Sequence, residues 1–263
     1  MEIGTFARNS SQVDFALKHE PDFIDLRMDL NHSIEFSETK KKLADAGVKC
    51  TLHLPSNPDW KPLNLAKDIV PFIDIGRQID ADLVTFHTTL SSLFYDDKDI
   101  ETFLTMLPDV CDSVRENAVP LAIETLGLYF TELLLLFDRH PNIGMALDLG
   151  HGQIMARRNR ALGHIESFTK QIKMIIIHDN NGQKMCDDVQ NLKKERNIPC
   201  EEMREMAVKY DEHLPIGEGS IDFDTMFWSL KQKSYDGKFL MMCGDQTKFP
   251  NERDVFMKMW LEA

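Results

Sequence analysis

The sequence predicts an α/β protein with the closed (β/α)8 barrel fold. Short apolar segments rich in β-branched residues alternate with longer amphipathic segments along the whole chain of 263 residues. The alternation gives eight strand–helix pairs over about 250 residues, which is the usual size of this barrel. A doubly wound open sheet is the alternative, but no glycine-rich phosphate-binding turn follows an early strand.

The strands are predicted from short apolar runs, and the helices from the 3.6-residue spacing of apolar positions between those runs. In chain order, the predicted strands are 2–6, 23–27, 48–54, 83–87, 120–124, 143–148, 172–178 and 238–243. The predicted helices are 11–19, 36–46, 64–80, 98–117, 131–139, 158–170, 186–209, 222–233 and 251–262. Local end signals support two of the helices, with Ser37 and Asp222 as expected N-caps and Gly47 as an expected C-cap.

The chain is expected to form one barrel domain over residues 1–263, because no linker, low-complexity run or short repeat suggests a second domain. One connection is unusual. About sixty residues separate the last two strands, far more than a loop and one helix require. We expect a helical insertion at about 183–209 that covers the barrel mouth and is followed directly by Asp211 and His213.

Composition and charge limit the classes of partner. A hydrophobic fraction of 43% is enough for a sizeable core, whereas the net charge of −13 repels phosphate backbones and makes nucleic acid a less probable partner. The five scattered cysteines lack a C-x-x-C pair, as expected of a reduced, cytoplasmic protein. No signal peptide and no apolar stretch of ~18 residues is present, so no membrane partner is expected.

Five consecutive predicted strands end in a residue that can bind a metal. These residues are His53, His87, Glu124, Asp148 and His178. His151 follows closely, and the stretch "YDEHLPIGEGSIDF" (210–223) adds Asp211 and His213. The carboxyl ends of barrel strands meet at one mouth, so one shared metal site explains this pattern better than five separate coincidences. Nitrogen and oxygen donors without thiolate suit zinc or manganese.

Several short stretches also occur in a known order. They are "LHLP…LNLA" (52–55, 63–66), "TFH" (85–87), "IETLG" (123–127), "LDLGH" (147–151), "IIIHDNNG" (175–182) and "DEHLPIGEGSIDF" (211–223). On these stretches the chain resembles the xylose-isomerase-like TIM barrel superfamily. That superfamily contains sugar isomerases and epimerases, some dehydratases, and endonuclease IV-type apurinic endonucleases.

The resemblance implies metal ligands in two arrangements. In the endonuclease branch, three zinc ions are held by the matches to His53, His87 and Glu124, to Glu124, Asp148 and His178, and to His151, Asp211 and His213. In the sugar branch, one divalent ion is held by the matches to Glu124, Asp148 and His178, together with a glutamate from the last strand. The resemblance thus implies that Asp211 and His213 are ligands or substrate contacts.

The last strand departs from the family pattern. The family ends this strand with a glutamate that binds metal and, in epimerases, moves a proton, but "GKFLMMCGDQ" places Met242 there. Cys243 is the next residue and should face the other way, since side chains alternate along a strand. Asp245 lies further along. The site is therefore expected to lack one carboxylate.

The first functional hypothesis is a divalent-metal-dependent isomerase or epimerase that acts on a small sugar or sugar phosphate. A metal ion would polarise a carbonyl or hydroxyl oxygen, and Glu124 would move the neighbouring carbon's proton as the catalytic base. Without the last-strand glutamate, a one-base aldose–ketose isomerisation suits the residues better than a two-base epimerisation. Arg27 and Lys184 lie near strand ends, where they would bind a phosphate or carboxylate of the substrate or be ordinary surface charges.

The alternative hypothesis is zinc-dependent phosphodiester hydrolysis at abasic DNA, as in the endonuclease IV-type enzymes, or the activity of a related metal-dependent lyase. The retained histidines and Asp211 favour hydrolysis. The missing glutamate, the acidic charge balance and the lack of a basic groove interleaved with aromatic residues disfavour it. A small-molecule substrate is therefore the favoured partner, and the sequence predicts no particular oligomeric state.

Overall fold

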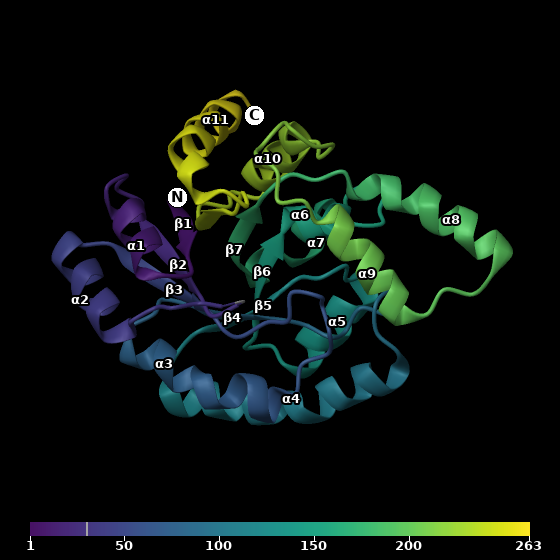
Figure 1. Ribbon diagram of the computed structural model, residues 1–263, viewed down its shortest axis with the longest axis horizontal. Coiled ribbons are helices and arrows are strands. Elements are labelled where there is room, and N and C mark those ends of the chain that lie inside the picture. Colours follow the sequence, from purple (N-terminus) through teal and green to yellow (C-terminus); the bar gives the residue numbers. More distant parts are fainter. Residues whose placement is uncertain (30) are drawn as a thin grey trace.

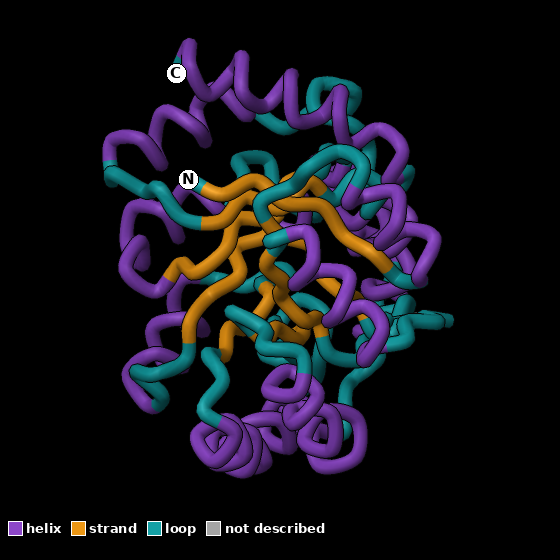
Figure 2. The backbone as a smooth tube through the Cα atoms, turned by 90° about the vertical axis from the view of Figure 1, so that its left-hand side faces the viewer, coloured by secondary structure: helices purple, strands orange, loops and turns teal. Residues whose placement is uncertain are grey.

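Parallel strands form a closed barrel in the computed structural model, which describes residues 1–29 and 31–263. The strands are β1 (Glu2–Ala7), β2 (Phe23–Arg27), β3 (Lys49–His53), β4 (Val84–His87), β5 (Leu121–Glu124), β6 (Gly144–Asp148), β7 (Ile172–Ile177) and β8 (Lys238–Met241). Each strand pairs with its neighbours in the chain, and β8 pairs with β1 to close the ring. Figure 1 and Figure 2 show the strands at the centre with helices around them. The predicted (β/α)8 barrel is confirmed.

The helices follow the strands in the predicted order. They are α1 (Ser10–Leu17), α2 (Phe36–Ala46), α3 (Ile73–Gln78), α4 (Asp97–Asn117), α5 (Phe130–Arg139), α6 (Leu149–Gln153), α7 (Ala161–Phe168), α8 (Met185–Glu195), α9 (Cys200–Tyr210), α10 (Phe223–Gln232) and α11 (Phe249–Glu262). Short 3-10 turns occupy Val70–Phe72, Thr169–Gln171, Gly182–Lys184 and Gln246–Lys248. None of the described helices is long and apolar enough to cross a membrane.

Two predicted helices are divided in the structure. The predicted helix 64–80 consists of a π-helical turn (Leu65–Ile69), a 3-10 turn and α3. Pro71 lies in the 3-10 turn and has no N–H group with which to continue an α-helical hydrogen-bond ladder. The predicted helix 186–209 is the pair α8 and α9, and Pro199 stands at the N-cap position of α9.

The predicted caps are confirmed at Gly47 and Asp222 but wrong at Ser37. Gly47 ends α2 with a left-handed φ of 67°, and the Asp222 side chain accepts a hydrogen bond from Thr225 N at the start of α10. The N-cap of α2 is Glu35, whereas Ser37 lies inside the helix. The helix begins earlier because Phe36 already has helical geometry and packs against the core.

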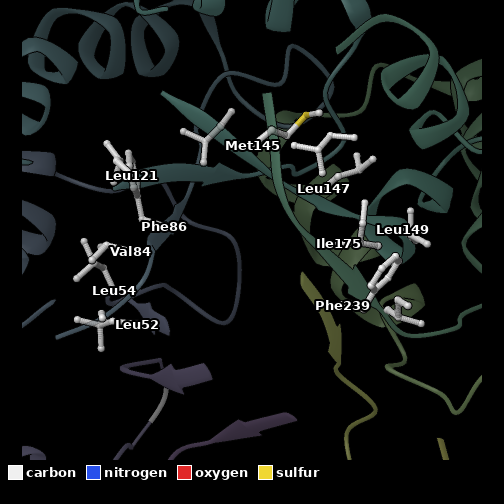
Figure 3. Close-up of a cluster of buried hydrophobic side chains, with 14 of the residues drawn as sticks. Leu52, Leu54, Val84, Phe86, Leu121, Met145, Leu147, Leu149, Ile175 and Phe239 are labelled. Atoms are coloured by element: carbon white, nitrogen blue, oxygen red, sulfur yellow. The ribbon is translucent and has the colours of Figure 1, made fainter. Parts of the chain in front are cut away.

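Side chains along each strand alternate between the barrel interior and the outer face that the helices cover. The outer face carries Leu52, Val84, Phe86, Ile175 and Phe239, which belong to the large apolar cluster between strands and helices (Figure 3). The interior cluster consists of Phe6, Phe23, Leu83, Ala122, Ala146, Met174, Ile176, Leu240 and Met242. The next inward positions along the strands therefore open at the carboxyl-terminal mouth.

Helices α8 and α9 pack on the carboxyl-terminal side of the barrel. Their apolar residues form a separate cluster with the loops that follow β3 to β6, whose members are Trp60, Phe94, Tyr95, Leu126, Ile154, Met185, Val189, Ile198, Met203 and Ala207. The buried Arg204 guanidinium donates a 2.7 Å hydrogen bond to the Phe94 carbonyl oxygen and attaches α9 to the loop after β4. Figure 1 shows the two helices together on one side of the barrel.

The loop that follows α9 is fastened to the end of β7 by Asp179. One oxygen of its buried carboxylate accepts hydrogen bonds from Gly217 N at 3.0 Å and Gly219 N at 2.9 Å. The other oxygen accepts from Asn180 N at 2.8 Å and Ile221 N at 3.1 Å. A Cβ atom on Gly219 would lie 2.3 Å from this carboxylate, so only glycine fits there. Asp179 therefore fixes the loop that begins with Asp211 and His213.

We expect Asp179→Asn to destabilise the protein by about 2–3 kcal/mol, because an amide has one acceptor oxygen where the backbone offers donors to two. Urea unfolding of the variant and the parent measures this difference. Asp222→Asn is the matched control, since asparagine caps a helix as well as aspartate does and the loss should stay within about 0.5 kcal/mol. Equal losses in the two variants would contradict the anchoring role of Asp179.

Candidate metal centre

The last inward position of every strand lies at one mouth of the barrel. These positions are Arg8, Arg27, His53, His87, Glu124, Asp148, His178 and Met242. Cross-strand register keeps some neighbours level, since Arg27 pairs with His53 and His87 pairs with Glu124. Other neighbours are offset by two residues, since His53 pairs with Thr85 and Glu124 with Ala146. A cavity of about 240 Å³ opens above them and is lined by loop residues together with Arg8, Arg27, His87, Glu124 and Met242.

Glu124 contacts two histidines and one arginine of the mouth. Its Oε1 atom lies 2.8 Å from His87 Nε2, and its Oε2 atom lies 3.3 Å from His53 Nε2. Arg27 Nη1 lies 3.5 Å from the same Oε2 atom. Burial would raise the pKa of Glu124, but the charge of Arg27 and the contacts with His87 and His53 outweigh it and hold this pKa well below its usual value. Glu124 is therefore an ionised carboxylate at neutral pH.

Asp148, at the end of the neighbouring strand β6, contacts two further histidines. Its Oδ1 atom lies 3.0 Å from His178 Nε2 and accepts a 2.7 Å hydrogen bond from His151 N at the start of α6. One turn of helix thus brings His151 back over the mouth. A Cβ atom on Gly150 would lie 2.0 Å from His178 Cε1, so a glycine is required for α6 to approach that ring. Burial alone would raise the pKa of Asp148, yet the nearby His151 and His178 lower it.

Asp211 and His213 complete a third group. Asp211 Oδ2 lies 3.3 Å from His151 Nε2 and 3.3 Å from His213 Nε2. The His213 ring stacks on His178 with 3.9 Å between centroids, and its Nδ1 atom lies 2.9 Å from the Met242 carbonyl oxygen. This contact favours a hydrogen on Nδ1 and leaves Nε2 as a donor atom for a ligand. His213 has a left-handed φ of 48°, a strained backbone geometry that often occurs at functional sites.

In the third group, a protonated His151 balances the negative charge of the neighbouring carboxylates. Burial lowers the pKa of His151, but Asp148 and Asp211 more than offset this and raise it to about 10. Asp211 shifts in the opposite direction, because His213 and His151 outweigh the effect of burial and hold its pKa well below the usual value. A bound cation would take the place of these protons.

The residues of the mouth fit a divalent metal ion. Within the described residues, donor atoms lie within 4.8 Å of one another in three groups: His53, His87 and Glu124; Glu124, Asp148 and His151; and His151, His178, Asp211 and His213. Several buried donor atoms make no hydrogen bond with the described residues, namely His53 Nε2, Glu124 Oε2, His178 Nδ1 and Asp211 Oδ1. Buried polar atoms without partners are costly, and a cation would satisfy them. Nitrogen and oxygen donors suit zinc or manganese.

All eight sequence-predicted ligand residues lie at this mouth, but their grouping differs from the one that the resemblance implies. His151 rather than His178 joins Glu124 and Asp148, and His178 lies with His151, Asp211 and His213. Arg27 lies in its wall, buried and paired with Asp25, Asp29 and Glu124. Lys184 is exposed at the end of a 3-10 turn and does not line the cavity, so the structure does not bring it together with the others.

Met242 occupies the inward position of the last strand. It lines the mouth cavity, whereas Cys243 and Asp245 line a different, narrow space beneath α11 together with Glu252. Cys243 thus faces away from the mouth, as expected, and no carboxylate from β8 enters the cavity.

Several residues that line the cavity were not predicted from the sequence, among them Arg8, Asp29 and Trp60. The sequence could have indicated Arg8, because it lies two positions beyond the inward-facing Phe6 and so continues the alternation of β1. No sequence pattern indicated Trp60, because it comes from the irregular loop after β3. Its ring lies edge-to-face against His151, with centroids 5.3 Å apart.

Comparison with known proteins identifies the family. Residues 13–256 match the family model described as "Xylose isomerase-like TIM barrel". The uncharacterized protein MJ1614 of Methanocaldococcus jannaschii is 24% identical over 239 residues, which cover 86% of this chain and 83% of that protein.

Two solved structures share the fold over nearly the whole chain. A D-tagatose 3-epimerase-like protein has a TM-score of 0.72 at 19% identity, covering 100% of this chain and 97% of the other. The IOLI protein, solved with a binding zinc atom, has a TM-score of 0.71 at 15% identity, covering 100% and 99%. Because the family model spans most of the sequence, this chain belongs to the xylose isomerase-like TIM barrel family.

Proposed function

We propose that this protein is a divalent-metal-dependent isomerase that acts on a small sugar or sugar phosphate. The observation that carries the proposal is an ionised, buried Glu124 among metal-ligand side chains in a cavity of small-molecule size. The likeness to a D-tagatose 3-epimerase-like protein supports a sugar as the substrate class. Zinc and manganese both suit the donor atoms.

Glu124 is the proposed catalytic base. A bound divalent ion would polarise a substrate oxygen as a Lewis acid or, in a hydrolytic reaction, a water molecule. Glu124 would take a proton from one carbon of the substrate and return it to the neighbouring carbon on the same face. The hydroxyl proton would pass from one substrate oxygen to the other in the same reaction, so that an aldose becomes a ketose. Arg27 holds the Glu124 carboxylate in place by charge at 3.5 Å. Trp60 and Val208 line the cavity and offer apolar contacts to a substrate.

In this proposal, the neutral side chain of Met242 favours isomerisation over epimerisation. Epimerisation with two bases needs a carboxylate on each face of the reacting carbon, and β8 contributes only a thioether. One base suffices for an aldose–ketose isomerisation, since the same group both removes and returns the proton. The residues of the mouth therefore support isomerisation better.

Phosphate-ester hydrolysis is the second candidate, and one observation favours it. The groups at His53 and His87 and at His151, Asp211 and His213 supply donors that a single-ion sugar reaction leaves unused. Several ions in one site are typical of phosphoester hydrolysis. The small cavity and the net charge of −13 favour a small ester over DNA as the substrate.

We expect Glu124→Ala to remove most of the bound metal and all activity, because the variant loses both a shared ligand and the base. Metal content by elemental analysis measures the first effect. For the second, aldoses, ketoses and their phosphates are incubated with metal-loaded protein in D2O, and the parent should incorporate deuterium beside the carbonyl carbon. Glu116→Ala, on the exposed surface of α4, is the control and should match the parent.

Two results decide between the candidates. Release of phosphate without deuterium incorporation would replace isomerisation with hydrolysis. Full metal content and unchanged exchange in Glu124→Ala would refute both assignments of Glu124.

We expect Met242→Glu to strengthen metal binding beside Glu124 and Asp148 by about tenfold or more, because a carboxylate adds both charge and a hard oxygen ligand. Competitive titration with zinc and with manganese measures the affinity. Met242→Gln is the matched control, since it has the shape of glutamate without the charge, and its affinity should stay near that of the parent. Identical affinities for all three proteins would show that position 242 does not reach the metal.

A further inference from the structure

Two arginines lie together on the wall of the mouth that β1 and β2 form. Arg8 Nε lies 2.8 Å from Asp29 Oδ1, and Arg8 Nη2 lies 3.3 Å from Asp29 Oδ2. Arg27 Nε lies 2.9 Å from the same Oδ2 atom. One carboxylate thus holds two guanidinium groups side by side, and all three residues line the cavity.

Each guanidinium group keeps donor capacity for a ligand. Among the described residues, Arg8 Nη1 and Arg27 Nη2 make no hydrogen bond. The Arg27 side chain is 4% exposed and the Arg8 side chain 28% exposed, so the first is enclosed and the second opens toward the entrance. An enclosed planar fork of N–H donors favours a planar or tetrahedral oxyanion over a neutral hydroxyl.

The position of the pair relative to Glu124 also favours an anion. Arg27 Nη1 lies 3.3 Å from Asp25 Oδ2 and 3.5 Å from Glu124 Oε2, so it joins the arginine pair to the candidate metal centre. Once a metal ion engages Glu124, that carboxylate offers less negative charge to Arg27. An anionic substrate group would then restore the charge balance of this part of the mouth.

We infer that Arg8 and Arg27, held by Asp29, form an oxyanion subsite that binds the phosphate or carboxylate group of the substrate. Anion binding at this subsite does not depend on the proposed isomerisation. Only the reaction that follows binding rests on the proposed function. The anion would lie beside the reacting carbon, since Arg27 contacts Glu124 directly. With a cavity of about 240 Å³, the substrate class is a compact sugar phosphate or sugar acid.

Calorimetric titration with inorganic phosphate tests the subsite without any turnover. The full chain is loaded with zinc, freed of excess metal, and titrated as parent, Arg8→Gln and Arg8→Lys. We expect phosphate affinity to fall about tenfold or more in Arg8→Gln, and by less in Arg8→Lys, which keeps the charge but loses the fork. Zinc content should be equal in all proteins, because Arg8 contacts none of the proposed ligands.

Arg157→Gln is the matched control. Arg157 also pairs with one aspartate, Asp187, but both are exposed on the surface and outside the cavity, so phosphate affinity should equal that of the parent. The titration is repeated with glycolate, and Arg8-dependent binding of glycolate instead of phosphate would assign a carboxylate substrate.

Equal affinity of the parent and Arg8→Gln for both anions, or no binding of either anion, would overturn the subsite. A merely structural role of Arg8 would lower the unfolding temperature of Arg8→Gln without a selective loss of anion affinity. If the deuterium exchange experiment fails while Arg8-dependent anion binding holds, only the proposed isomerisation falls.

Discussion

The geometry of this protein depends on the two-residue alternation of side chains in a closed parallel barrel. Because the strands run in one direction and the ring has no edge, each inward row ends at the same mouth. The rows begin with apolar residues such as Ala122, Ala146 and Ile176. They end two positions later with Glu124, Asp148 and His178, so apolar packing below supports a polar layer above.

That polar layer must balance its own charge, since burial penalises every unpaired ion. Each carboxylate of the ring has a basic or imidazole partner, Arg27 beside Glu124 and His178 beside Asp148. The pKa of His151, raised to about 10, means that a proton occupies a place between Asp148 and Asp211. Protons and metal ions compete for such a site, so metal binding releases protons. Asp179 supports the same layer from outside by holding the loop of Asp211 and His213.

Much of this arrangement could be predicted from the sequence, because it depends on periodic patterns. All eight strands lie within a few residues of their predicted positions, and the predicted ligands meet at one mouth. Features that depend on a single residue or on an irregular loop, rather than on a repeating pattern, were not predictable in this way. The division of residues 64–80 depends on Pro71, and the contact of Trp60 with His151 depends on a loop folding over the mouth. Ser37 resembles a cap in sequence, yet the packing of Phe36 starts the helix before it.

Diffraction from zinc-soaked crystals, recorded at the zinc absorption edge, would show whether the inward strand ends form a metal centre around Glu124. We expect anomalous density inside the mouth, bounded by His53, His87 and Glu124 or by His151, Asp211 and His213. Density confined to the outer surface, with the mouth free of metal at saturating zinc, would contradict it.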